Sequence, residues 1–252
     1  MTGFRKLFIK LGLFSLFIFI GFNNYASFLD EQLQYTRVNA AYKEKKPIIA
    51  EKLQLMDLSL KNVKVMIKAY KYEQIVKIYV QSKTEKVWRV YKKFPFNCTS
   101  GDLGPKRKEG DFQIPEGYYK VNHFNPYSNF HLSLGVSYPN KADKIKSPFK
   151  DKGGAIYMHG GCATIGCIPI EDEPIKEVYI LSVLAKDNGQ KSIPIHIFPF
   201  EYSEKKFASA IKLYPEHEAF WTNIYEIEKK FEADKITPAV AIDSNGDYYE
   251  VE

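Results

Sequence analysis

The segment Tyr157–Ile170 reads YMHGGCATIGCIPI and gathers the most reactive side chains of the chain. It places His159, Cys162 and Cys167 within nine residues, so two of the three cysteines of the chain lie in it. This pattern fits three kinds of chemistry: a metal site, a disulfide, and a cysteine nucleophile with a histidine base. Each of them makes a different demand on the neighbouring residues.

A metal site would use His159, Cys162 and Cys167, because the spacing H-x2-C-x4-C can chelate zinc. A structural zinc site needs a fourth ligand, however, and no further histidine or cysteine lies close by in the sequence. A Cys162–Cys167 disulfide would close a loop with only four intervening residues, which restricts the unfolded chain little. Both cysteines could also be buried, unreactive side chains, with His159 as a core histidine. We therefore expect no metal.

A cysteine nucleophile needs an imidazole that accepts its proton and backbone N–H groups that stabilise an oxyanion. The segment offers both: an apolar strand ends at His159, a glycine-rich loop follows, and Cys167 precedes a helix that begins with acidic residues. Gly160, Gly161 and Gly166 allow this loop to bend sharply and to turn N–H groups toward a ligand. The spacing is compatible with a nucleophile but does not exclude buried cysteines.

The N-terminus predicts export. A basic stretch, MTGFRKLFIK, precedes the twelve apolar residues LGLFSLFIFIGF, as in a secretory signal or a signal-anchor over residues 1–27. The following NNYAS makes a poor cleavage site, so the sequence leaves open whether the segment is removed or kept as a membrane anchor. We expect a location in the periplasm or cell envelope.

An odd number of cysteines in an exported protein leaves at least one thiol free, and we expect Cys98 to be a buried free thiol. Cys162 is close enough in sequence to pair with Cys167 under oxidation.

Composition argues against a nucleic-acid partner. The formal net charge is +6, and three of the cations lie in the N-terminal segment. The remaining excess of positive charge is too small for a surface that binds nucleic acid. The chain is 45% hydrophobic and 15% aromatic, which favours a globular, strand-rich core.

Hydrophobic periodicity predicts an α+β fold. Alternating apolar residues predict strands at 63–70, 75–82, 87–94, 117–124, 129–138 and 192–200. Helical spacing predicts helices within 28–60, at 171–189 and at 218–231, and an Asn-Gly turn predicts a hairpin within 238–251. We therefore expect a helical lead-in over 28–60, a β-rich catalytic core of antiparallel, sandwich-like sheets over 61–200, and a C-terminal helix-plus-hairpin extension over 201–252.

Four stretches in order resemble the L,D-transpeptidase catalytic domain (YkuD) family, and in particular its YafK-like branch. They read SGDLGPKRKEGDFQIPEGYY (100–119), HFNPYSNFHLSLGVSYPN (123–140), YMHGGCATIGC (157–167) and FWTNIYEIEKKFEADKITPAVAIDSNGDYY (220–249). The third stretch resembles the catalytic signature of the family, in which His-Gly precedes a loop that ends in Ser/Thr-x-Gly-Cys.

The resemblance implies roles for the residues of the segment. Cys167 takes the place of the nucleophile and His159 that of its base. The N–H groups of Gly166 and Cys167 take the place of the oxyanion hole, and Gly160 belongs to the same loop. The common signature ends in Ser-His-Gly-Cys, whereas this chain has an isoleucine, Ile165, in place of the second histidine.

Other residues are weaker candidates for the substrate groove. His131 and Ser133 face the same side of the predicted strand 129–138, while Phe130, Leu132 and Leu134 face the other. An ordinary half-exposed strand face explains this pattern equally well. Tyr119 and Lys106 are substrate-binding candidates of the same kind.

The resemblance implies an L,D-transpeptidase that acts on the stem peptides of peptidoglycan through a thioester and needs no cofactor. A hydrolase that uses the same thioester, and releases a cross-link or a wall-linked lipoprotein, is the alternative. A thiol-redox protein that uses Cys162 and Cys167 would more naturally show C-x-x-C. A wall-binding protein without catalysis would not need both His159 and Cys167.

Overall fold

The computed structural model describes residues 26–251 of the chain. The predicted signal or signal-anchor over residues 1–27 lies almost entirely outside the described residues and stays a prediction. Between residues 26 and 251, none of the helices is long and apolar enough to cross a membrane.

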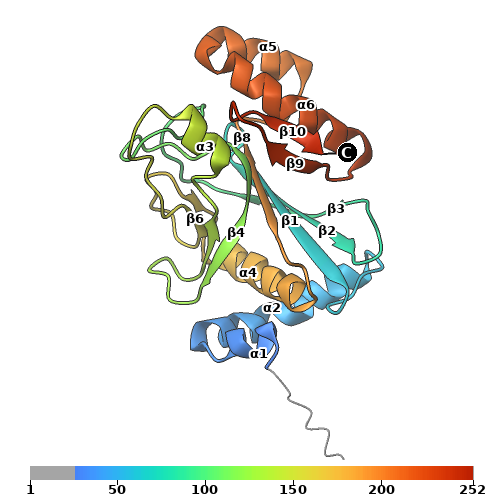
Figure 1. Cartoon of the computed structure of the whole chain (residues 1–252). Coiled ribbons are helices and arrows are strands. Elements are labelled where there is room, and N and C mark those ends of the chain that lie inside the picture. Colours follow the sequence, from blue (N-terminus) through green and yellow to red (C-terminus); the bar gives the residue numbers. More distant parts are fainter. Residues whose placement is uncertain (1–25, 252) are drawn as a thin grey trace, which may run out of the picture.

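A curled sheet of eight strands forms the centre of the molecule, in the order β3-β2-β1-β8-β4-β5-β6-β7 (Figure 1). Its strands are β1 (Val63–Tyr70), β2 (Ile75–Ser82), β3 (Arg89–Pro95), β4 (Gly117–Asn125), β5 (Ser133–Val136), β6 (Tyr157–His159), β7 (Ile168–Pro169) and β8 (Pro194–Phe198). β1 pairs with β8 in parallel, as does β6 with β7, and the other neighbours are antiparallel. β6 and β7, which flank the glycine-rich loop, therefore lie together at one end of the sheet.

Helices cover the sheet from two sides (Figure 1). On one side lie α1 (Phe28–Leu33), α2 (Thr36–Gln54) and α4 (Asp172–Asp187), and both α1 and α2 contact α4. On the other side lie α5 (Glu204–Leu213), α6 (Glu218–Asp234) and a hairpin of β9 (Ala239–Ile242) and β10 (Tyr248–Val251). The short helix α3 (Lys141–Lys146) follows β5.

The central strand β1 shows why both faces of the sheet are covered. Its alternate side chains Val65 and Ile67 belong to the large apolar core, while Met66 on the opposite face packs with Tyr79, Trp88 and Phe231 of α6. Lys68, which is on the same face as Met66, is fully buried and forms an ion pair of 2.7 Å with Glu228 of α6. A strand buried on both faces needs partners on both faces, and the C-terminal layer supplies the second set.

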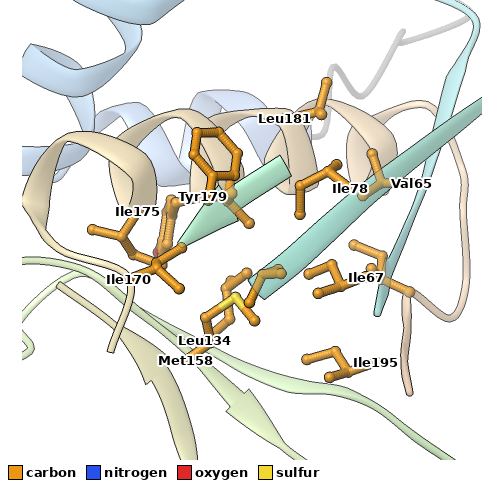
Figure 2. Packing of buried hydrophobic residues seen from close by; sticks show 14 of the residues in the cluster. Val65, Ile67, Ile78, Leu134, Met158, Ile170, Ile175, Tyr179, Leu181 and Ile195 are labelled. Atoms are coloured by element: carbon orange, nitrogen blue, oxygen red, sulfur yellow. The ribbon is translucent and has the colours of Figure 1, made fainter. Parts of the chain in front are cut away.

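The large core holds the end of the sheet where the glycine-rich loop begins. Figure 2 shows Leu134 of β5 and Met158 of β6 among the aliphatic side chains of β1 and β2, with Ile175 and Tyr179 of α4 beside them. Burying each such side chain stabilises the fold by about 1.5–3 kcal/mol. His159 follows Met158 directly, so its backbone is anchored beside this buried core.

The α+β class predicted from the sequence is confirmed. Strands β1 and β2 coincide with the predicted 63–70 and 75–82. Helices α4 and α6 and the β9–β10 hairpin also form where the pattern predicts them. The predicted strand over 129–138 is shorter, because His131 adopts a left-handed backbone with a φ of 66° that a strand cannot contain. The prediction that Phe130 shares a face with Leu132 and Leu134 is therefore wrong: Phe130 lies outside the strand and is partly exposed.

Candidate active site

His159 ends β6 with its side chain buried and its orientation fixed. In the sheet it lies opposite Ser133 of β5 and Pro169 of β7. Its Nδ1 lies 2.5 Å from the carbonyl oxygen of Gly160. Because a carbonyl oxygen only accepts hydrogen bonds, Nδ1 carries the proton and Nε2 is the basic nitrogen. The backbone of the next residue thus selects the tautomer that a general base needs.

The ring of Phe130 packs on the imidazole of His159. The two ring centroids lie 4.6 Å apart, with an interplanar angle of 28°. Phe130 itself is 41% exposed, so it separates the imidazole from solvent on one face. Nothing in the sequence pattern singled out this residue, because the predicted strand placed it on the core face.

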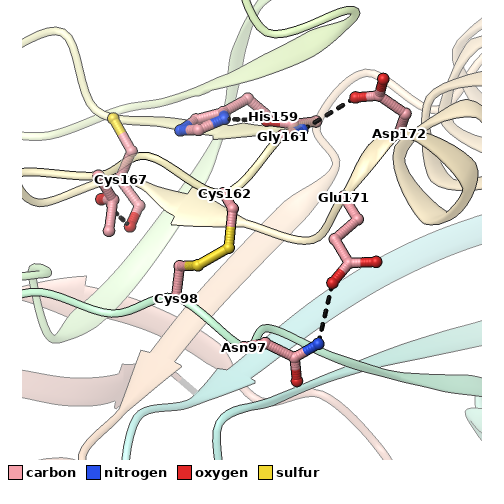
Figure 3. Close-up of a disulfide and its surroundings, with 10 residues drawn as sticks. Asn97, Cys98, His159, Gly161, Cys162, Cys167, Glu171 and Asp172 are labelled. Carbon is pink, nitrogen blue, oxygen red and sulfur yellow. Dashed lines mark hydrogen bonds between the residues drawn. A yellow bond between two sulfur atoms is a disulfide. The ribbon is translucent and has the colours of Figure 1, made fainter.

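Cys167 directly precedes β7, and the parallel pairing of β6 with β7 brings it beside Tyr157, the first residue of β6. Its Sγ accepts a hydrogen bond from the backbone N–H of Tyr157 at 3.4 Å and lies 3.7 Å from the carbonyl oxygen of Ala155. In Figure 3 the Nε2 side of the His159 ring is directed toward the side chain of Cys167.

Burial keeps both groups of this pair uncharged at rest. It lowers the pKa of His159 below its usual value, although the hydrogen bond to Gly160 opposes the shift. It raises the pKa of Cys167, against the opposing effects of the Tyr157 N–H and the charge of Lys106. A neutral imidazole beside a neutral thiol suits general-base activation, in which the proton moves as the sulfur attacks.

The glycine-rich loop between them is held by hydrogen bonds at both ends. At its start, Gly161 donates its N–H to the carboxylate of Asp172 at 2.9 Å. A Cβ on Gly160 would lie 2.4 Å from that carboxylate, so only glycine fits there. At its end, the Thr164 hydroxyl donates to the carbonyl of Cys167 at 2.8 Å and accepts the N–H of Gly166 at 3.2 Å. The loop is therefore a fixed scaffold.

These contacts separate the roles of the two predicted loop glycines. Gly160 uses its carbonyl for His159, and its N–H donates to the carbonyl of Phe130 at 3.0 Å. It therefore orients the base. Gly166 has a φ of 132°, and a Cβ there would lie 2.9 Å from the carbonyl oxygen of Gln113. This conformation turns its N–H toward the hydroxyl of Thr164, next to the thiol.

Cys98 and Cys162 form a disulfide, with Cα atoms 5.4 Å apart (Figure 3). The predictions that Cys98 is a free thiol and that Cys162 pairs with Cys167 are therefore wrong. The two partners are 64 residues apart in sequence, and only the folded sheet brings the segment after β3 beside the loop. Cys167 remains as the free thiol of the chain, as the odd cysteine count predicts.

The disulfide also bears on the metal interpretation. Cys162 can no longer serve as a thiolate ligand beside His159 and Cys167. Among residues 26–251, no group of three or more histidine, cysteine, aspartate or glutamate side chains is arranged to hold a metal ion.

Two of the four weaker candidates lie beside the catalytic pair. Ser133 is buried in β5 opposite His159. His131 follows Phe130, and its Nε2 is buried without a hydrogen-bond partner among the described residues. We retain both as candidates for substrate contacts.

The other two candidates have structural partners. The hydroxyl of Tyr119 donates to the buried carboxylate of Asp143 at 3.0 Å. Lys106 is buried, and its Nζ pairs with Asp111 at 2.6 Å. Lys106 is near enough to influence the pKa of Cys167, so its charge acts on the thiol from within a fixed ion pair.

A cavity of about 710 Å³ lies away from this pair, between α5 and the segment that follows Cys98. Its lining includes Tyr72, Thr99, Asp102 and Tyr214, and neither catalytic candidate. The cavity is therefore separate from the candidate pair His159 and Cys167.

Comparison with known proteins agrees with this geometry. The L,D-transpeptidase catalytic domain (YkuD) family matches residues 67–188. The proteins named "Putative L,D-transpeptidase YafK" of Escherichia coli strains K12 and O157:H7 are each 28% identical over 186 residues, which cover 73% of this chain and 72% of theirs.

Two solved structures also show similarity to this chain. The helical cell shape determining protein Pgp2 from Campylobacter jejuni is 21% identical, with a TM-score of 0.42, over 59% of this chain and 53% of its own. Bd1075 of Bdellovibrio bacteriovorus is 19% identical, with a TM-score of 0.40, over 68% and 58%. This chain thus spans little more than half the length of these two structures. The match of the L,D-transpeptidase catalytic domain (YkuD) family to residues 67–188, together with the similarity to YafK, confirms the resemblance read from the sequence.

Proposed function

We propose that this protein is a cysteine-dependent L,D-transpeptidase that acts on the stem peptides of peptidoglycan, the polymer on which its family acts. One observation carries the proposal: Cys167 is the thiol that the Cys98–Cys162 disulfide leaves free, and it faces an imidazole whose tautomer is fixed for proton acceptance. A redox role for Cys162 and Cys167 loses support, because Cys162 is bound to another cysteine.

In the proposed reaction, Sγ of Cys167 attacks the carbonyl carbon of the L,D bond in a stem peptide, and its proton passes to Nε2 of His159. The oxyanion of the tetrahedral intermediate accepts hydrogen bonds from the backbone N–H groups of Gly166 and Cys167. The C–N bond then breaks, the leaving amine takes the proton from His159, and a thioester remains. A second amine attacks the thioester, gives its proton to His159, and restores the thiol. All groups in these steps belong to the protein or to its substrates.

Two structural features support this sequence of steps. The hydroxyl of Thr164 binds both the Gly166 N–H and the Cys167 carbonyl, which holds the peptide that carries the oxyanion donors in one orientation. The 3.2 Å bond to Gly166 is long enough to be shared with an incoming oxyanion. The stacked ring of Phe130 limits the hydration of the base.

The first test is to trap the thioester. The purified protein is incubated with tetrapeptide muropeptides and analysed by mass spectrometry, and we expect an adduct of the tripeptide acyl group on the peptide that contains Cys167. Cys167→Ala should form no adduct, and His159→Gln should form it far more slowly. If Cys167→Ala released D-alanine as fast as the wild type, the assignment of the nucleophile would be wrong.

Water in place of the second amine would make the protein a hydrolase, which is the alternative. The side chain of Ile165, where the common signature has histidine, is 71% exposed beside the nucleophile, so this chain presents an apolar surface to the acceptor. The reaction is run in oxygen-18 water with a muropeptide, and separately with a wall-linked protein as donor. Cross-linked dimers or exchanged D-amino acids support transfer. Label in the released tripeptide without either product would establish hydrolysis.

The proposed substrate also implies a location in the cell envelope. A family that acts on the cell wall works in the envelope, which agrees with the export predicted from the N-terminus. Retention of that segment as an anchor would hold the enzyme close to the wall. Mass measurement of the mature protein from cell membranes decides whether the segment is removed.

A further inference from the structure

A side chain from the first turn of helix α2 contacts the loop that precedes β5. The guanidinium of Arg37 donates from Nη1 to the carbonyl oxygen of Ser128 at 2.6 Å, and also to the carbonyl of His131. Both acceptors belong to one short loop, and Phe130 lies between them. One side chain thus bridges the two ends of the segment that carries Phe130.

That segment is the one that contacts the catalytic base. The ring of Phe130 stacks on the imidazole of His159, and its carbonyl accepts the N–H of Gly160. Gly160 in turn provides the carbonyl that binds Nδ1 of His159. The position of Phe130 therefore affects both the face of the imidazole and the backbone that selects its tautomer.

The loop needs support from outside. His131 has a φ of 66°, a conformation that side-chain-bearing residues keep only where the surroundings hold it. Phe130 is too exposed to be held by burial alone. The hydrogen bonds of Arg37 act at both ends of this strained stretch.

Helix α2 is rigid enough to provide this support. Val38, Ile49 and Leu53 bury one face of α2 in the large core. Lys45 pairs with Glu173 at the start of α4 at 2.6 Å, so the helix is fixed close to the catalytic loop. Arg37 therefore projects from a fixed platform that lies outside residues 67–188, the part matched by the family.

We propose that Arg37 is a positioning residue for the catalytic base. It holds the loop 128–131 so that Phe130 and Gly160 keep Nε2 of His159 directed at Cys167. The helical lead-in is then part of the catalytic machinery. This inference rests on the proposed roles of His159 and Cys167, but its test does not require the proposed substrate.

The test uses the reactivity of Cys167 toward iodoacetamide, measured without reductant across a range of pH. With Cys98 and Cys162 in a disulfide, Cys167 is the thiol that reacts. In this step the sulfur forms a bond to the methylene carbon, iodide leaves, and the thiol proton passes to His159. We expect Arg37→Ala to slow alkylation near neutral pH roughly 10- to 100-fold, as misplacement of a catalytic group does. The alkylation rate of Arg37→Ala should then rise only as the pH approaches the raised pKa of the Cys167 thiol.

Matched variants separate positioning from general loss of structure. Lys43→Ala removes another long, exposed cation of α2 and should leave the alkylation profile unchanged. Arg37→Lys, which keeps a donor in reach of the two carbonyls, should restore part of the rate. Phe130→Leu should reproduce the profile of Arg37→Ala, because it removes the stacked ring and leaves α2 intact.

Thermal unfolding is recorded for every variant. If Arg37→Ala folds and keeps the wild-type alkylation profile, the inference is overturned. If it does not fold, Phe130→Leu decides: a wild-type profile in that variant overturns the inference equally. A shifted profile together with the absence of a thioester from muropeptides would refute the proposed substrate and keep the role of Arg37.

Discussion

Removal of the Cys98–Cys162 disulfide should lower the free energy of unfolding strongly and should change the rate of thioester formation little. The double variant Cys98→Ser/Cys162→Ser opens a loop that joins residues 64 apart. Loop-closure entropy for a loop of this length corresponds to about 4 kcal/mol of unfolding free energy. A chain of this size loses roughly 2–4 °C of melting temperature per kcal/mol, so the expected decrease is roughly 10 °C. Thermal unfolding of the oxidised wild type and the variant measures the difference.

The active-site loop should keep its shape in that variant, because other contacts remain. Asn97 donates to the carboxylate of Glu171 at 2.9 Å, and Gly161 keeps its bond to Asp172. We therefore expect the double variant to form the thioester at a rate close to that of the wild type at 25 °C. An unchanged melting temperature, or three titratable thiols in the unreduced wild type, would refute this reasoning.

The two single variants provide an internal control. Cys98→Ser leaves Cys162 free in the same loop as Cys167. Treatment with oxidised glutathione should then join these two sulfurs, with glutathione reduced, and abolish activity until a reductant is added. Cys162→Ser leaves no second thiol in that loop and should keep more of its activity under the same treatment. Equal inactivation of both variants would show that Cys162 is not the residue that captures Cys167.

Further predictions concern the catalytic pair and its support. Cys167→Ala should abolish turnover and His159→Gln should remove most of it, with melting temperatures close to that of the wild type; both are checked with muropeptides. Because burial holds the pKa of His159 below 6.5, its protonation stops turnover only below that pH, so the acidic limb of the pH–rate profile should lie below 6.5 and should vanish in His159→Gln. Gly160→Ala would place a Cβ 2.4 Å from the carboxylate of Asp172 and 2.7 Å from the carbonyl of Phe130, and should lower the unfolding free energy by about 1–3 kcal/mol in chemical denaturation.

Local sequence patterns were sufficient where structure depends on near neighbours. Strands β1 and β2 follow directly from alternation, and α4 follows from its apolar stripe and acidic start, because each of these elements buries a face set by its own periodicity. The candidate pair His159 and Cys167 was named from its resemblance to the family signature, because the spacing alone also fitted buried cysteines. His159 and Cys167 lie eight positions apart, and the parallel pairing of β6 with β7 needs only the loop between them.

Features that depend on contacts across the fold were not accessible. The Cys98–Cys162 bond and the contact of Arg37 with the loop 128–131 join segments 64 and more residues apart. The left-handed backbone of His131 has no local signal either, since its neighbours alternate as a strand would. These are positions where the tertiary structure overrides a local preference, and all three surround the catalytic pair.

The part of the chain that defines the family is not a self-sufficient unit in this fold. Strand β8, at Pro194–Phe198, lies outside residues 67–188 and pairs with both β1 and β4. Without β8, the centre of the sheet would present two unpaired strand edges, and β4, β5 and β6 would lose their connection to β1 and β2. The pair of Lys68 and Glu228 gives a second reason. Loss of the Glu228 carboxylate alone would leave the ammonium of Lys68 buried without its partner, which costs several kcal/mol. The proposed catalysis at His159 would therefore depend on residues on both sides of the family segment: α2 contacts the loop that carries Phe130, and β8 with α6 supports the sheet that carries His159.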